Sequence, residues 1–229
     1  MFTMVAFQRL TLAEQAYEEL QEQIVSGQLP AGRRLLADEL AGLLAISQTP
    51  VKEALTRLEQ DGLVEGASRR GSVVRRFTLS DIREIYEARL LLECHAATVG
   101  LAGGHVTAAF LDRLQTIFDQ HMTEIAKQTA DGLAETIRLD RQFHEIIVAL
   151  AENQLTARWH RIALRQTQTI RNYSLRRYDG QRLRHEHGVI IEAFRSADSE
   201  CVGAALRFHL TASRDEFLSR PPEDLPIRP

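Results

Sequence analysis

The residues best suited to chemistry in this chain lie on one helical stripe. Ile137, Asp140, His144 and Ile147 are spaced by three, four and three residues, so they would share one face of a helix. An aspartate on an apolar, core-facing stripe is costly unless it is paired or bound to a metal. Asp140 and His144 would project side by side and could share a cation.

His187 and His209 each lie on the apolar face of a later helical pattern. A single inward histidine is more often a hydrogen-bonded core residue than a ligand. Three of them with an inward aspartate favour a metal site, and a purely polar core is the alternative. One carboxylate and three imidazoles suit a borderline divalent ion, with zinc favoured over nickel, manganese or iron(II).

Four protein ligands can leave one or two positions of the metal for an oxygen ligand. An open position attracts carboxylates, and inward arginines would complete such a pocket by bidentate pairing. Arg89 and Arg171 are the candidates, although either could be an ordinary, partly exposed arginine. The other histidines are interpreted as surface or structural residues: His95, His105, His121, His160 and His185.

Helices must position these side chains, and the chain reads as helix from Leu79 onward. Apolar residues recur at helical spacing between breaks that contain Gly, Asn and Asp. The pattern predicts an all-α antiparallel bundle with helices over 80–102, 106–129, 132–151, 154–174, 181–196 and 199–218.

A different unit is predicted before this bundle. A capping-box pattern at Thr11 and Glu14 begins a first helix that ends near Ser26. Two shorter helical patterns follow between Ala37 and Val64, separated by a break at residues 45–47, which is typical of a helix-turn-helix. The second of them buries Val51, Ala54, Leu55 and Leu58, exposes Gln48, Thr49, Lys52, Glu53 and Thr56, and could be capped by either Ser47 or Thr49.

A small β-hairpin is predicted directly after the helix-turn-helix. Residues 63–65 and 72–75 are β-prone runs joined by a turn rich in Gly and Arg. In this position the hairpin would be a wing. Arg69 and Arg70 at its tip could contact phosphates or the minor groove, and the alternative is a solvated basic turn.

Composition narrows the possible functions. A net charge of −3 means that DNA binding must rest on local charge, such as the arginines of the wing. The two cysteines, Cys94 and Cys201, are too few and too far apart for a disulfide framework or a thiolate zinc site. There is no run of about 18 apolar residues and no signal-peptide pattern, so we expect a cytoplasmic protein without a membrane segment.

These residues resemble those of a GntR-family bacterial transcription regulator of the FadR subgroup, whose effector domain is called FCD. Residues 10–76 follow the family's DNA-binding pattern, and residues 78–218 match through Asp140, His144, His187 and His209. The resemblance implies a mainly α fold, with a winged helix-turn-helix over 8–77 and a metal- and effector-binding, dimerising domain over 78–220. Six helices resemble the smaller, VanR-like form of that domain.

The resemblance also implies partners and roles. Members of the family are typically homodimers that bind short palindromic operators, and a small organic acid changes their grip on DNA. This chain departs from the family at Gln48 and Lys52, where arginine is usual, and Gln pairs more naturally with adenine than with guanine. The residues expected at the DNA are Arg33, Ser47, Gln48, Thr49, Lys52, Arg57, Arg69, Arg70 and Gly71.

The leading hypothesis is therefore a ligand-responsive transcriptional regulator that acts as a repressor. A metal-dependent enzyme is the alternative from another class, because three histidines and a carboxylate can activate water. The chain has no HExxH motif and no separate general base, so it is not expected to be an enzyme. A direct metal sensor is a third reading, which differs only in what acts as the signal.

Overall fold

The computed structural model describes residues 10–68, 71–127, 129–174 and 179–219. The chain divides into two compact units between Arg76 and Phe77. Two residues expected at the tip of the wing, Arg69 and Arg70, lie outside the described residues. Each unit has its own hydrophobic core, so each is described by itself.

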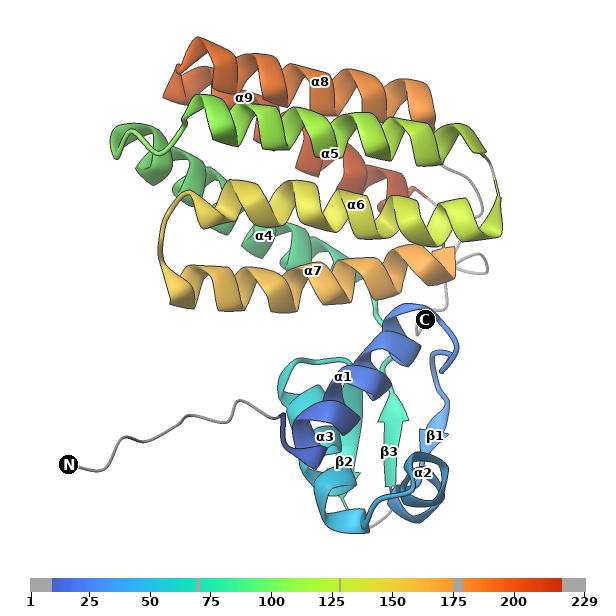
Figure 1. The fold of residues 1–229 in the computed structure, drawn as a ribbon. Helices are drawn as coiled ribbons and strands as arrows, with labels where there is room; N and C mark the ends of the chain where they lie inside the picture. The colour runs from blue at the N-terminus through green and yellow to red at the C-terminus, as the bar shows by residue number, and fades with distance from the viewer. Residues whose placement is uncertain (1–9, 69–70, 128, 175–178, 220–229) are drawn as a thin grey trace, which may run out of the picture. The chain divides into compact units, whose positions relative to one another are not determined.

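Three helices form most of the first unit (Figure 1). Thr11 and Glu14 make the expected reciprocal capping box at the start of the first helix. Ala45 ends the second helix in the left-handed conformation, with φ 54°, and the third begins three residues later at Gln48. The helix-turn-helix prediction is confirmed. The helices are α1 (Leu12–Val25), α2 (Ala37–Leu44) and α3 (Gln48–Gln60).

A small antiparallel sheet completes the first unit. Its strands are β1 (Arg34–Leu35), β2 (Val64–Ser68) and β3 (Gly71–Val74), in the order β1-β3-β2. The β2–β3 hairpin is the predicted wing, whereas β1 was missed. Leu35, which no sequence pattern assigned to a strand, pairs with Ser72 of β3 and is buried.

The core of the first unit fixes which face of α3 is free. Val51, Ala54, Leu55 and Leu58 are buried against α1 and the sheet, as their spacing predicted. Burial of each large aliphatic side chain stabilises the unit by roughly 1.5–3 kcal/mol. The polar side chains of α3 are consequently left on its exposed side.

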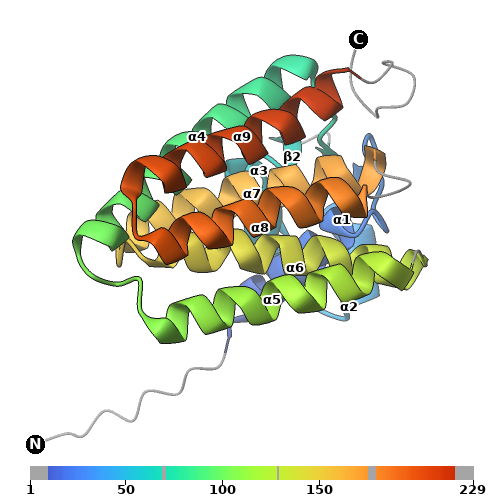
Figure 2. The same cartoon turned by 90° about the horizontal axis from the view of Figure 1, so that it is seen from above.

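Six helices of the second unit form a closed ring in the described part of the chain. Going round, α4 packs on α9, α9 on α8, α8 on α5, α5 on α6, α6 on α7 and α7 on α4, while α4 also contacts α6 (Figures 1 and 2). The ring encloses one interior to which every helix can contribute. The helices are α4 (Leu79–Ala102), α5 (Ala108–Lys127), α6 (Ala130–Ala149), α7 (Gln154–Ser174), α8 (Gly180–Ser196) and α9 (Ser199–Leu218).

The helix boundaries in this unit agree with the sequence prediction to within two residues. Local capping explains this agreement. Thr78 and Asp81 form a capping box at α4, and Asp179 and Asp198 accept backbone N–H groups at the first turns of α8 and α9. Within the described ranges, no helix has the length and apolar character needed to cross a membrane.

Candidate metal centre

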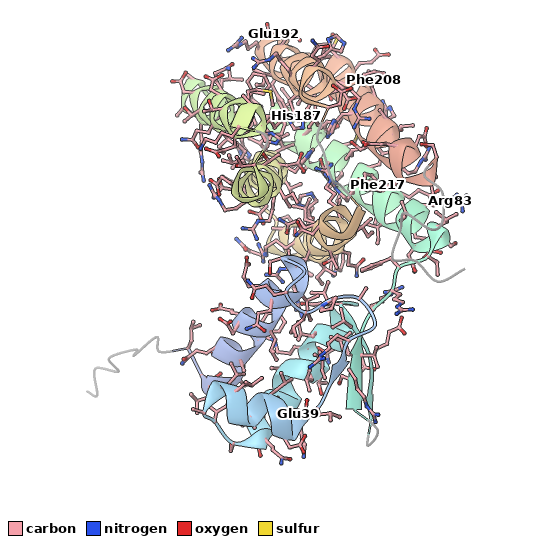
Figure 3. The ribbon with its side chains drawn as sticks, turned by 90° about the vertical axis from the view of Figure 1, so that its right-hand side faces the viewer. Glu39, Arg83, His187, Glu192, Phe208 and Phe217 are labelled. Atoms are coloured by element: carbon pink, nitrogen blue, oxygen red, sulfur yellow. The ribbon has the colours of Figure 1, made fainter. Side chains whose placement is uncertain are left out.

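Four side chains converge in the interior of the ring. Asp140 and His144 come from α6, His187 from α8 and His209 from α9, and all four are buried. One potential ligand atom from each lies within 4.8 Å of all the others. These are the four residues selected from the sequence. Figure 3 shows His187 directed into the bundle, whereas Glu192 on the same helix lies on the outer side.

The spacing of the four atoms fits a coordination shell. Nε2 of His209 lies 3.3 Å from Nε2 of His144 and 3.4 Å from Nε2 of His187. Oδ1 of Asp140 lies 3.6 Å from Nε2 of His187 and 3.9 Å from Nε2 of His144. Ligand atoms about 2.1 Å from a metal would be about 3.4 Å apart in tetrahedral positions and about 3.0 Å apart in adjacent octahedral positions, which leave room for further ligands. These four separations lie near that range, and the donor chemistry suits a borderline divalent ion.

Two buried glutamates orient two of the imidazoles. Nδ1 of His144 donates to Oε2 of Glu93, and Nδ1 of His209 donates to Oε2 of Glu186, each at 2.7 Å. Donation through Nδ1 leaves the Nε2 lone pairs of both rings facing one another, an arrangement that a shared cation would stabilise. Carboxylates behind ligating histidines are the usual support of a metal site.

Asp140 is held as a charged carboxylate. Nη1 of Arg171 donates to Oδ2 at 2.6 Å, while Oδ1 has no hydrogen-bond donor among the described residues. Burial alone raises the pKa of this carboxyl, but the charge of the Arg171 guanidinium holds the pKa well below its usual value. A charged oxygen without a hydrogen bond is thus directed at the three histidines.

His187 and His209 are held in the form that binds metals. Burial is the largest cause that lowers the pKa of both His187 and His209, so their neutral forms are favoured. Neutral imidazoles can use Nε2 as a ligand without first losing a proton.

Four further buried polar residues lie around these side chains, and sequence periodicity selected none of them as part of the site. They are Glu93, His121, His160 and Glu186. Nε2 of His160 lies 3.0 Å from Oε1 of Glu93, so Glu93 is shared between two histidines. Of the two interpretations that the sequence left open for His160, a surface residue or a structural one, the structure agrees with the second.

His121 is also buried, so it too is an interior residue and not a surface one. Its ring centroid lies 5.4 Å from that of His187, and burial lowers its pKa to about 4. Neither of its nitrogens has a hydrogen-bond partner among the described residues. The signal for its burial was in the sequence, because Ile117 and Ile125 lie four residues away on either side.

Both candidate effector arginines are buried near the centre. Arg171 pairs with Asp140, as described above. Arg89 is completely buried, and its Nε donates to Oε1 of Glu93 at 2.9 Å. Its Nη1 and Nη2 have no hydrogen-bond partner among the described residues. Arg89 is thus joined to His144 through Glu93.

The residues expected at the DNA are arranged on the first unit as follows. Ser47, Gln48, Thr49 and Lys52 are exposed at and after the start of α3. Ser47 stands at the N-cap position, but its hydroxyl makes no capping hydrogen bond. Arg33 is exposed and directly precedes β1. Gly71 is the first residue of β3 and has a φ of 88°. The Arg57 guanidinium lies 4.2 Å from the centroid of the Tyr17 ring.

A winged helix joined to a six-helix bundle defines a class of winged-helix transcriptional regulators with a helical companion domain. Comparison with protein families makes this specific. The model for bacterial regulatory proteins of the gntR family matches residues 12–74, and the FCD domain model matches residues 84–212. The chain therefore belongs to the GntR family of transcriptional regulators and carries an FCD domain.

Individual relatives agree with this assignment. The chain is 32% identical over 142 residues to the uncharacterized HTH-type transcriptional regulator YdhC of Bacillus subtilis. The aligned region covers 61% of this chain and 61% of YdhC. It is 27% identical over 201 residues to the HTH-type transcriptional repressor RspR of Escherichia coli, covering 86% of this chain and 85% of the repressor. These relatives are transcriptional regulators and not enzymes.

A solved structure has the same fold. A GntR regulator from Rhodococcus sp. RHA1 superposes with a TM-score of 0.77 at 23% identity, covering 91% of this chain and 98% of the other.

Proposed function

We propose that this GntR-family regulator is a repressor whose helical domain binds a divalent metal ion and a small organic acid that changes its affinity for operator DNA. The observation that carries the proposal is the convergence of Asp140, His144, His187 and His209 on one buried point. The two supporting glutamates strengthen it, because a merely polar core does not require lone pairs to face each other.

Asp140, His144, His187 and His209 would hold the metal, with zinc favoured and nickel, manganese or iron(II) as alternatives. When bound, the metal supplies a Lewis acid that accepts an oxygen of the effector. Arg171 would keep Asp140 in place beside the open positions, and Arg89 would pair with the effector. The function of this chemistry is recognition of a ligand, since the relatives are regulators.

Operator binding would use the exposed residues of the first unit. On α3, the side chains of Gln48, Thr49 and Lys52 would enter the major groove. Ser47, at the start of this helix, would contact the phosphate backbone of the DNA. Arg33, Arg57, Gly71 and the arginines of the wing, Arg69 and Arg70, would add contacts to the phosphates. A homodimer on a short palindrome is the proposed form, because two half-sites require two winged helices.

The test is a titration of operator DNA at a fixed, saturating zinc concentration, with a panel of small carboxylic acids. We expect some acids to change the operator Kd at least tenfold, whereas varying zinc without an acid should have a smaller effect. If zinc alone accounts for the whole change, the protein is a metal sensor. If the purified protein binds no divalent metal by elemental analysis and titration, the four residues form only a polar core.

A further inference from the structure

Arg89 is the least satisfied charged group described in the second unit. Its side chain is 0% exposed, and its Nε donates a hydrogen bond to Oε1 of Glu93. The two terminal nitrogens carry four N–H donors, none of which has an acceptor among the described residues. Leaving such donors buried without acceptors is costly, so an anion at this position would stabilise the protein considerably.

One hydroxyl on α4 and one on α9 are also buried without hydrogen-bond partners among the described residues. The first is that of Tyr86, whose ring centroid lies 5.4 Å from Cζ of Arg89. The second is that of Ser213, one turn before Phe217 on α9, and Phe217 packs on Tyr86 with ring centroids 6.2 Å apart. Cys94 of α4 lies against Gly203 of α9, so the two helices run antiparallel, and Ser213 lies on the stretch of α9 that is opposite Arg89.

Arg89 is close to the candidate metal centre but is not part of it. Its Nε bonds to one oxygen of Glu93 at 2.9 Å, and the other oxygen bonds to Nδ1 of His144 at 2.7 Å. This chain of contacts limits the distance from Nε of Arg89 to Nε2 of His144 to about 10 Å. A molecule with three to five carbons could contact both ends.

We propose that Arg89, with the hydroxyls of Tyr86 and Ser213, forms a second anion subsite, so that the effector is a short dianion of the dicarboxylate class. One carboxylate would meet the metal and the other would accept hydrogen bonds from Nη1 and Nη2 of Arg89. This inference rests on the proposed function and names the class of ligand for that site. A monocarboxylate would leave the terminal nitrogens of Arg89 unsatisfied, which is the source of discrimination.

The experiment compares succinate with succinamate, in which one carboxylate is replaced by an amide of nearly the same size. Zinc-loaded protein is titrated with each compound by calorimetry, and the melting temperature is recorded in parallel. We expect the wild type to bind succinate at least about tenfold more tightly, because a bidentate, charge-assisted contact is lost in succinamate. Malonate and glutarate test the length, and adipate should bind more weakly.

Three variants assign the difference to Arg89 and its neighbour. Arg89→Met should abolish the preference for succinate over succinamate, and Arg89→Lys should retain part of it. Tyr86→Phe removes a hydroxyl that makes no hydrogen bond in the protein, so it should weaken succinate binding severalfold without lowering the melting temperature. Retention of bound zinc in each variant checks that the metal centre has folded.

The outcomes separate this inference from the proposed function. Equal binding of succinate and succinamate by the wild type, with both dependent on zinc, would overturn the dianion and leave the metal and carboxylate proposal intact. A preference for succinate that survives in Arg89→Met would place the second anion elsewhere. Failure of every carboxylate to bind zinc-loaded protein would contradict the proposed function itself.

Discussion

Glu93 is the residue on which several parts of the candidate centre depend. It accepts from Nε of Arg89, Nδ1 of His144 and Nε2 of His160, and it is completely buried. Burial alone raises the pKa of its carboxyl, but His144 and Arg89 hold the pKa well below its usual value. A charged carboxylate is therefore available to orient both the candidate metal ligand His144 and the side chain of Arg89.

Removing the charge of Glu93 should weaken metal binding. We expect Glu93→Gln to lower zinc affinity about 10- to 100-fold, because the amide keeps the shape but holds His144 less firmly. Competition with a chromophoric chelator measures the affinity. Glu192→Gln, an exposed glutamate on α8, is the matched control and should bind zinc like the wild type. Equal affinities in the two variants would mean that Glu93 does not support the metal ligand.

The residues found from the sequence and those missed differ in a physical way. Asp140 and His144 were found because an acid and an imidazole interrupt an apolar stripe of one helix. Glu93 and Glu186 were missed because the imidazoles that they support lie on other helices, at sequence separations of 51 and 23 residues. Each also pairs with an arginine four residues away on its own helix, a spacing that is ordinary for ion pairs on a helix surface and does not by itself indicate burial. Periodicity along one helix carries no information about such partners.

At the scale of elements, the two sides of α3 have different roles. Its apolar side fixes the position of the helix in the first unit, and its polar side would determine which bases it recognises. Its predicted stripe is buried, and Gln48 is exposed in its first turn. Glutamine can pair with adenine through two hydrogen bonds, whereas arginine forks onto guanine. The residue type at position 48 should therefore determine which base the protein prefers at one position of the operator.

Gln48→Arg should shift operator preference towards guanine at one position of each half-site, by about 1–3 kcal/mol of discrimination. Selection of bound sequences from a random pool measures this. Gln28→Arg makes the same chemical change at an exposed position in the turn after α1, so it controls for added charge. An unchanged base preference in Gln48→Arg would show that this side chain does not read a base.

The start of α9 provides a test of pH dependence. Asp198 accepts backbone N–H groups of Cys201 and Glu200, and these bonds lower its pKa. A lowered folded-state pKa gives stability that is present above the unfolded pKa and is lost as pH falls through the folded one. Asp198→Asn keeps an acceptor at the cap but cannot titrate.

We expect Asp198→Ala to melt a few degrees below the wild type at pH 7, with a smaller gap at pH 3. Asp198→Asn should stay closer to the wild type at pH 7 and show less dependence on pH in this range. Thermal denaturation followed by circular dichroism provides the measurement. A gap between Asp198→Ala and the wild type that did not shrink in acid would contradict a charged cap.

Element boundaries were predicted well where local side chains cap the helices, as at Thr11 and Asp198. The strand β1 was not predicted because it has only two residues, Arg34 and Leu35. Its existence depends on pairing with β3, about 38 residues later in the chain, and not on a pattern of its own. Strands that depend on pairing with a distant segment cannot be predicted from local sequence patterns.

At the scale of the whole molecule, the division into two units has a thermodynamic consequence. All the candidate metal ligands lie in the second unit, and the first has a separate core. A ligand stabilises only the cooperative unit that binds it. The metal should therefore protect one unit selectively, unless the two units unfold together.

We expect zinc at 100 times its Kd to raise the melting temperature of the second unit by roughly 5–10 °C and to leave the first nearly unchanged. Trp159, the only tryptophan in the sequence, lies on α7 and reports on the second unit by fluorescence. Hydrogen exchange of the α3 amides reports on the first. His144→Ala should remove the zinc-dependent shift at Trp159, because one ligand and its link to Glu93 are lost. A rise of similar size in the protection of α3 would instead show that the two units unfold together, so that metal binding is transmitted to the part that reads DNA.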